Sequence, residues 1–422
     1  MSSPGATLAH ARRPMSGRDP HEKGRVASSL ELLFDLTFVV AFANAGSEMA
    51  HHVAAGHWTT GLLGFSFAVF AICWAWINFS WFASAFDTDD WSYRLLTMVQ
   101  MIGVVILSLG IPPLFASLDH GEHLDNRTMV LGYIVMRVAM VAQWLRVAQQ
   151  SPAHRRTAHT YVAAITIAQL GWVALAFANT SLTTVVLGAL VLYVIELGGP
   201  FLAETRIGGI PWHPHHIAER YGLLAIITLG EGIVGTVASL GAATTVGGWS
   251  LDAALIVFAG MSLTFGLWWI YFGVAWGEIL HLRPNRAFGF GYLDIVLFGA
   301  IAAVGMGLHV AAYTLEAKSE PEAFSWVHIS PVGAILATAI PVVVFVVALF
   351  VLWTYLLRSH DRLHTGLMVL TALAIGGSVV LAAAGVRLSI CLVVLSFAPA
   401  ISVIGFEVVG HRHQERALDA HR

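Results

Sequence analysis

The sequence contains few charged side chains for its length. Asp, Glu, Lys and Arg make up 11% of the 422 residues, whereas a soluble globular domain has about 25%. Hydrophobic residues make up 57% of the chain, so there are too few polar side chains to cover a surface in water. Because only helices and closed barrels satisfy their backbone hydrogen bonds in lipid, the lack of charge predicts an integral membrane protein.

Other features of soluble enzymes and nucleic-acid-binding proteins are also absent. The net charge is −3, so there is no basic surface for nucleic acid and we expect no such partner. The two cysteines, Cys73 and Cys391, lie in apolar runs and exclude a disulfide framework. The sequence has no phosphate loop, dinucleotide fingerprint, nucleophile elbow or HExxH motif. We therefore expect no cofactor and no enzymatic activity, with an intramembrane enzyme built from scattered residues as a distant alternative.

The apolar residues form long runs of about 20 residues, the length that a helix needs to cross a bilayer. They lack the alternation of barrel strands, so the predicted fold class is an all-α polytopic membrane protein. We count twelve spans, at approximately 29–50, 60–85, 93–117, 128–148, 159–179, 182–203, 215–240, 252–277, 287–313, 329–357, 364–384 and 386–409.

The distribution of Lys and Arg supports an even number of spans. With the N-terminus in the cytoplasm, 18 of the 22 basic residues lie on the inner side, 3 lie outside and Arg137 lies within a span. This split follows the positive-inside rule and places both termini in the cytoplasm.

The second half of the chain resembles the first. Arg146 and Glu196 recur as Arg358 and Glu407 at offsets of 212 and 211 residues. The sequence therefore predicts two six-helix repeats, at 29–206 and 207–410, and transporters with parallel repeats bind their substrate between the halves. Residues 1–28 and 411–422 are expected to be cytoplasmic tails, the first of them disordered.

Ionisable side chains within or beside the spans are the candidate functional residues, because such groups are costly in a membrane. Glu31 and Asp35 are spaced i, i+4 on one helix face, which Phe38 and Phe42 continue. The eight acids exceed what one mid-membrane arginine can neutralise, which favours a hydrated pathway for a small solute, an ion or protons. The acids are Glu31, Asp35, Glu48, Glu196, Glu219, Glu231, Asp294 and Glu407, and the pathway set also includes Arg137 and Arg220.

Arg137 requires an acidic partner or water at that depth. Glu231 is the first candidate because both residues lie near mid-membrane, and Glu196 is the second. The alternative interpretation is a buried ion pair that only fixes helix packing. Histidines near span ends, such as His213, His215 and His216, meet no standard metal spacing, so no metal site is expected.

Three stretches carry a resemblance to the bacterial low temperature requirement A (LtrA) family. Residues 31–39, ELLFDLTFV, are similar to the family's ELFFDLVFV, and residues 216–231 are similar to its HxxERYGLF…LGES block. A third family stretch resembles residues 268–272. The chain departs from the family at Leu33, Thr37 and Gly232, and the last change removes a hydroxyl beside Glu231. The resemblance implies a multi-pass protein of the bacterial inner membrane that is needed for growth at low temperature.

These features lead to three hypotheses. The first is a transporter or permease, coupled to protons, whose substrate is unknown and in which Glu31, Asp35, Glu219, Arg220 and Glu231 line the site. The second is a cation channel, because Phe34-Asp35 also resembles the FSD motif of potassium channels with two six-helix repeats. The third is a membrane sensor or scaffold in which the acids form structural pairs. The sequence leaves open whether the protein is a homo-oligomer.

Overall fold

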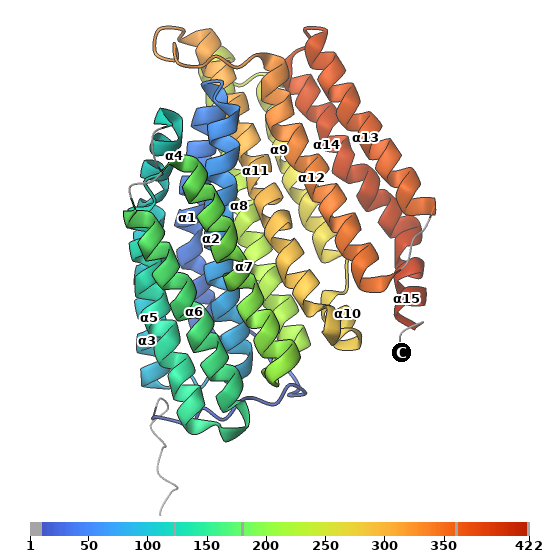
Figure 1. Ribbon diagram of the computed structural model, residues 1–422. Coiled ribbons are helices and arrows are strands. Elements are labelled where there is room, and N and C mark those ends of the chain that lie inside the picture. The colour runs from blue at the N-terminus through green and yellow to red at the C-terminus, as the bar shows by residue number, and fades with distance from the viewer. Residues whose placement is uncertain (1–10, 122–123, 179–180, 359–361, 420–422) are drawn as a thin grey trace, which may run out of the picture. The chain divides into compact units, whose positions relative to one another are not determined.

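The computed structural model of the protein describes residues 11–121, 124–178, 181–358 and 362–419 (Figure 1). Within these residues the regular structure is entirely helical. The longer helices are α1 (Ser29–Ala54), α2 (Trp58–Phe86), α3 (Trp91–Leu109), α4 (Ile111–His120), α5 (Arg127–Gln150), α6 (Arg155–Phe177), α7 (Leu182–Leu202), α8 (Pro214–Gly247), α9 (Leu251–Phe272), α10 (Trp276–Leu282), α11 (Ala287–Ser319), α12 (Pro331–Leu357), α13 (Arg362–Ala383), α14 (Leu388–Gly405) and α15 (His411–Asp419).

The predicted all-α fold and the twelve spans are confirmed. In the described part of the chain, 12 helical segments are long and apolar enough to cross a membrane. The third span is interrupted at Gly110, where α3 ends and α4 begins with two prolines in its first turn. The last two spans form a tight hairpin, in which Gly385 takes a left-handed conformation with φ of 77°.

The chain divides into two compact units. Unit 1 contains Met1–Ala41 and Ala71–Arg220, and unit 2 contains Phe42–Phe70 and Tyr221–Arg422. In unit 1, α3 packs on α5, α5 on α6 and α6 on α7; in unit 2, α11 packs on α12, α12 on α13 and α13 on α14 (Figure 1). Spans three to six and spans nine to twelve thus have the same neighbours along the chain, although the six-helix repeat itself stays a prediction.

The sixth and twelfth spans end in the same irregular way. Pro200 lies inside α7, which continues into a π-helix at Ala203–Ile207. Pro399 lies inside α14, which continues into a π-helix at Phe406–Gly410. Short π-helical turns are rare and occur often at functional sites.

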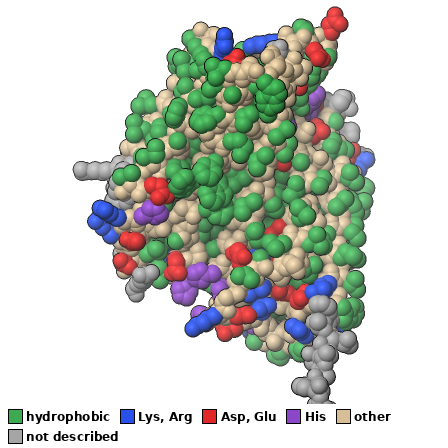
Figure 2. Space-filling model, turned by 180° about the vertical axis from the view of Figure 1, so that it is seen from behind, with side chains coloured by type: hydrophobic (Ala, Val, Ile, Leu, Met, Phe, Trp, Pro, Cys, Tyr) green, Lys and Arg blue, Asp and Glu red, His purple; other side chains and the backbone are tan. Residues whose placement is uncertain are grey.

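Apolar side chains dominate the surface that a bilayer would contact. On the face shown in Figure 2, hydrophobic side chains cover most of the surface, and charged side chains gather mainly near its edges. Isolated exposed residues on the helices, such as Leu170 and Val194, are 65% and 72% exposed. This pattern fits a multi-pass membrane protein, in which lipid covers the apolar helix faces.

The predicted flexible tail at 1–28 is wrong for the part that the structure describes. Residues 11–28 form an arm, here called the N-terminal arm, which runs along unit 1. Met15 is fully buried and its amide donates to Gln150 Oε1 at 2.8 Å. The Arg18 amide donates to the Ala85 carbonyl at 2.8 Å, and the Glu22 carbonyl lies 2.9 Å from His213 Nε2. The amino-acid composition of this segment predicts disorder, because tertiary hydrogen bonds cannot be inferred from composition.

The C-terminal segment is also more ordered than expected for a solvated tail. Residues 411–419 form α15, which packs on α10, and Gln414 Oε1 accepts from the Ala275 amide at 3.3 Å. Residues 1–10 and 420–422 of the two predicted tails lie outside the described residues.

Asp90 anchors the N-terminal arm to the start of α3. It accepts from the amide of Arg13 at 2.9 Å, from the amide of Tyr93 at 2.9 Å and from the guanidinium of Arg146. Burial alone would raise the pKa of Asp90, but the hydrogen bonds from Arg146, Arg13 and Tyr93 outweigh it and lower that pKa from 3.8 to about 2. The ionised carboxylate therefore holds the arm in place.

Asp90→Asn is expected to destabilise the protein by about 2 kcal/mol at neutral pH, since each pKa unit corresponds to about 1.4 kcal/mol. A lowered folded-state pKa gives stability that is complete above the ordinary value of 3.8 and is lost as pH falls towards about 2. The gap between the unfolding midpoints of wild type and variant should therefore close over this acidic range. Asp89→Asn, which alters an exposed pair with Arg94, is the control. A gap that does not change with pH would contradict the assignment.

Candidate functional site

Unit 1 contains a group of ionisable side chains that are almost completely buried. We call it the buried charge cluster. Its members come from the N-terminal arm, the start of α1, the end of α2 and the start of α8. They are Arg25, Glu31, Asp35, Asp87, His216 and Arg220, with exposed fractions from 0% to 9%.

Arg220 is the centre of this cluster. Its guanidinium donates to Asp35 Oδ1 at 2.6 Å and to Ser80 Oγ at 3.1 Å, and it lies 3.7 Å from Glu31 Oε1. The guanidinium carbon is 5.6 Å from the centre of the Trp76 ring, close enough for a cation–π contact. Trp76 Nε1 also donates to Asp35 Oδ1, at 2.7 Å. Asp35 therefore receives two donors on one oxygen.

The arm side of the cluster contains Arg25, Asp87 and His216. Arg25 lies 3.9 Å from Glu31 and 3.5 Å from Asp87, and His216 Nε2 lies 3.2 Å from Glu31 Oε1. Burial and the charge of Glu31 raise the pKa of Asp87 to about 6, although Arg25 acts in the opposite direction. The Asp87 carboxyl can therefore take up a proton close to neutral pH.

The formal charges of the cluster do not cancel. Three carboxylates and two guanidinium groups give a charge of −1 when His216 is neutral. Arg18 also lies 3.7 Å from Asp87, but it is bound at 2.7 Å by Glu22, so this outer pair adds no net charge. One additional proton or monovalent cation would make the cluster neutral. Its binding would be favourable, because an unbalanced buried charge costs several kcal/mol.

Several polar atoms of the cluster have no hydrogen-bond partner among the residues that the structure describes. They are Asp35 Oδ2, Nδ1 of His216, and Nε and one terminal nitrogen of Arg220, whereas Glu31 Oε1 and His216 Nε2 face each other at 3.2 Å. Such atoms are rare in native interiors and call for a functional or solvent-based explanation. The cluster therefore has free donors and acceptors in addition to its charge.

Part of the sequence prediction for these helices is confirmed and part is corrected. Glu31 and Asp35 do share one buried face with Phe38 and Phe42. Arg220, which we placed in the pathway set but did not count as a mid-membrane arginine, is fully buried and contacts two of the acids. The prediction that a single buried arginine is available to balance the eight acids was therefore wrong. Glu219 is exposed and accepts from the Ala27 amide at 3.2 Å, so it lies beside the cluster and not within it.

Arg137 forms a second buried ion pair in unit 1. Its guanidinium donates to Glu196 Oε2 at 2.8 Å and to Asn78 Oδ1 at 3.2 Å. Trp74 Nε1 donates to the same Glu196 oxygen at 2.6 Å. The first predicted partner, Glu231, is therefore wrong and the second, Glu196, is confirmed. Depth in the membrane could not decide between two acids on different helices.

A small cavity lies beside this pair. It has a volume of about 10 Å³ and is lined by Asn78, Gln100, Tyr133, Arg137 and three apolar residues. Such a volume holds about one water molecule. Gln100 is 2% exposed and its Nε2 has no partner among the described residues. The polar lining makes this a suitable site for one bound water.

Arg137→Met is expected to lower the free energy of unfolding by about 2 kcal/mol, because Glu196 would remain buried without its counterion. The double change Arg137→Met with Glu196→Gln should recover at least half of this loss, since Gln can still accept from Trp74. Thermal unfolding in one detergent measures both. Equal destabilisation by the single and double changes would show that the pair is not coupled.

The predicted site residues of unit 2 occupy different environments. Glu231 is 6% exposed in the middle part of α8. Asp294 is fully buried on α11 and accepts from the Tyr271 hydroxyl at 2.9 Å. Glu48 is half-buried, 3.9 Å from His52. Glu407 is exposed, accepts from Trp269 Nε1 at 2.8 Å and lies 3.1 Å from His411. Glu407 is therefore a surface residue and not part of a buried site.

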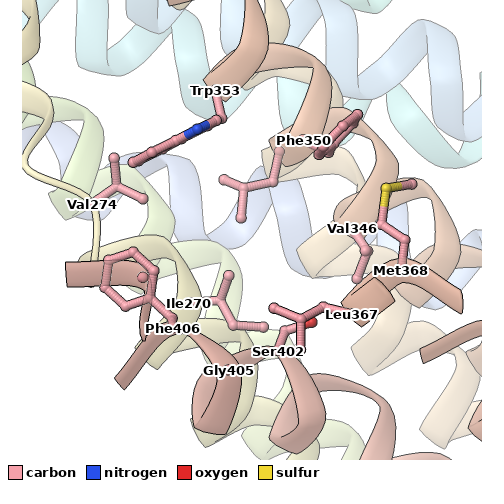
Figure 3. A pocket seen from close by; sticks show the side chains of 12 residues that line it. Ile270, Val274, Val346, Phe350, Trp353, Leu367, Met368, Ser402, Gly405 and Phe406 are labelled. Atoms are coloured by element: carbon pink, nitrogen blue, oxygen red, sulfur yellow. The ribbon is translucent and has the colours of Figure 1, made fainter. Parts of the chain in front are cut away.

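Unit 2 also has an apolar groove, shown in Figure 3. Side chains from the ends of α9, α12 and α14 and the start of α13 converge on a cavity of about 90 Å³. Eleven of its twelve lining residues are apolar or glycine, and the polar one is Ser402. None of the predicted acids lines it, so the groove offers shape and apolar contact but no ionisable group.

Sequence reasoning missed several members of the buried charge cluster. His216 stands in the HHIAER stretch, but it was treated together with His213 and His215 as a histidine near a span end. Arg25 and Asp87 lie outside the spans and were treated as loop residues. A signal was present for Trp76, because its indole needs an acceptor when buried.

Comparison with known proteins agrees with this architecture. Residues 26–398 match the family model described as Bacterial low temperature requirement A protein (LtrA). The chain is 26% identical over 254 residues to a protein of Rhizobium meliloti (strain 1021) described as Uncharacterized protein RA0937. The aligned region covers 58% of each chain, so this protein spans little more than half the length of that relative. No solved structure matches.

Proposed function

The chain belongs to the family of bacterial low temperature requirement A proteins, and on this premise we propose that it transports a small solute or ion across the bacterial cytoplasmic membrane, coupled to protons. The twelve candidate spans leave little chain for a soluble catalytic domain. The sequence also lacks the enzyme motifs named above. Transport is therefore a better fit than catalysis.

The observation that carries this proposal is the unbalanced buried charge cluster. A structural ion-pair network would be neutral, with its donors and acceptors matched. This cluster has one carboxylate in excess of its guanidinium groups, and several of its polar atoms are unpartnered. Uptake and release of one proton or cation would switch it between neutral and charged states, which is what a coupling site must do.

The position of the N-terminal arm suggests how access to the cluster is controlled. Arg25 and the amide of Ser28, which donates to Glu31 Oε2 at 2.7 Å, close the cluster from the arm side. When the buried Arg220 is left out of the count, 17 Lys and Arg residues lie on the predicted inner side and 3 lie on the outer side. This distribution supports cytoplasmic termini. On this orientation the arm covers the cytoplasmic entrance, and solute exchange requires it to move.

Parallels between the halves support a transporter built from two repeats. An indole of the second span donates to an acid of the sixth, Trp74 to Glu196, and Trp269 of the eighth span donates in the same way to Glu407 of the twelfth. Glu196 lies shortly before Pro200 in α7, and Glu407 lies within the π-helix that follows α14. Repeated halves of this kind are typical of secondary transporters.

The test is ion and proton flux in liposomes that contain the purified protein. Wild type is compared with Asp35→Asn, which keeps an acceptor for Arg220 and Trp76 but removes one charge of the cluster. Flux is expected to fall at least about tenfold in the variant, which corresponds to a rise of about 1.4 kcal/mol or more in the transport barrier. Asp252→Asn, in an exposed pair with Arg387, is the matched control.

Whether the flux depends on a proton gradient distinguishes the channel hypothesis from the transporter hypothesis. Cation flux without a proton gradient would favour a channel, and flux only with a proton gradient would favour a coupled carrier. Equal flux in wild type and a folded Asp35→Asn variant would reject the cluster as the pathway. Loss of stability in Asp35→Asn with no flux in any protein would favour the sensor or scaffold hypothesis.

A further inference from the structure

Glu231 lies where helices of unit 2 are packed closely. A Cβ atom added at Gly305 of α11 would stand 2.3 Å from the carbonyl of Glu231, and one added at Gly232 would stand 2.4 Å from Thr264 Oγ1 of α9. A Cβ at Gly46 of α1 would be 3.3 Å from Glu231 Oε2 itself. The backbone of α8 at Glu231 is therefore held against α11, and the carboxylate faces Gly46, which has no side chain to cover it.

This environment offers the carboxylate no donor. The nearby hydroxyls are already used: Thr236 donates to the Gly232 carbonyl at 2.6 Å and Thr264 donates to the Gly260 carbonyl at 2.9 Å. Among the described residues, no hydrogen bond or ion pair reaches Glu231, although its side chain is only 6% exposed. By contrast, Glu196 in unit 1 has both an arginine and an indole.

Titratable groups lie on each of the helices that pack around Glu231. On α11 they are Tyr292, Asp294, His309, Tyr313, Glu316 and Lys318, of which His309 lies about one turn after Gly305, and on α1 the nearest is Glu48, two residues after Gly46. On α9 they are Asp252 and Tyr271, near its two ends. None of them forms an ion pair or hydrogen bond with Glu231 in the described part of the chain. No fixed charge therefore compensates an ionised Glu231.

We propose that Glu231 is a reversible proton-binding site within unit 2. The carboxylate takes a proton from hydronium, releases water and becomes the neutral acid that this apolar site accommodates. A metal ion would need several oxygen ligands, and among the described residues Glu231 is the one carboxylate that the close contacts at Gly46 and Gly305 involve. The ligand class is therefore the proton.

This inference deepens the proposed function, on which it rests for the use of the proton in transport. The two can fail separately, because proton binding at Glu231 can be measured without any flux. A hydrophobic carbodiimide reacts with protonated carboxyls in apolar surroundings and leaves a stable adduct. Dicyclohexylcarbodiimide is applied to the full-length protein in lipid, and peptide mass mapping locates the adduct on wild type itself.

We expect the adduct on the peptide that contains Glu231, with a yield that falls at least about tenfold from mildly acidic to alkaline buffer. Exposed Glu407 should stay unlabelled and serves as the internal control. Glu231→Gln should remove this adduct and leave any label on Asp294. Absence of label at Glu231 in acidic buffer would overturn the proposal, and so would a yield that is the same at every pH. Label at Glu231 with no proton flux in liposomes would reject coupled transport and retain the proton site.

Discussion

Arg220→Met is expected to lower the free energy of unfolding by about 3–5 kcal/mol, because the change leaves two buried carboxylates without their shared counterion. Arg220 is fully buried and contacts Asp35 at 2.6 Å and Glu31 at 3.7 Å. Methionine fills much of the same volume between Trp76 and Phe79, so lost packing is a minor part of the effect. Unfolding by SDS in mixed micelles measures the difference.

A double variant separates the ionic effect from a general disturbance. Arg220→Met with Asp35→Asn removes one cation and one anion, and we expect it to be more stable than Arg220→Met alone by at least about 1–2 kcal/mol. Arg387→Met, which breaks an exposed pair with Asp252, is the control and should cost less than about 1 kcal/mol. A loss of less than about 1 kcal/mol for Arg220→Met would show that the cluster contributes little to folding.

Gly305→Ala is expected to destabilise the protein by about 3 kcal/mol, close to the upper range for overpacking. The added methyl group would meet the carbonyl and C atoms of Glu231 at 2.3 Å and the amide nitrogen of Gly232 at 2.7 Å. These are backbone atoms of α8, so no side-chain rotation can relieve the contact and the two helices must separate. Thermal unfolding in detergent gives the change in stability.

Gly230→Ala is the matched control for this prediction. Gly230 precedes Glu231 on α8, and a Cβ there would meet no atom within 4 Å. Replacing a helical glycine with alanine in open space is neutral or stabilises by up to about 1 kcal/mol. If both substitutions had the same effect, the close approach of α8 and α11 at Gly305 would be disproved.

The membrane class and the number of spans were determined by the sequence itself. Runs of about 20 apolar residues have one stable arrangement in lipid, the helix, because lipid supplies no hydrogen bonds to the backbone. The tight hairpin at Gly385 could also be predicted, since it is the chain between two such runs. For the same reason Glu31 and Asp35 could be placed on one face, because helix periodicity depends on neighbouring residues alone.

The pairing of charges was decided by the tertiary structure. Arg137 had two acids at similar depth, and the helix neighbours that select Glu196 are not encoded by hydropathy. Arg25 lies outside the predicted spans and was not a candidate, yet it is buried, as Arg220 is. A buried ion pair forms between residues that are 59 or 185 positions apart, and such contacts depend on how helices pack, which local sequence patterns do not specify.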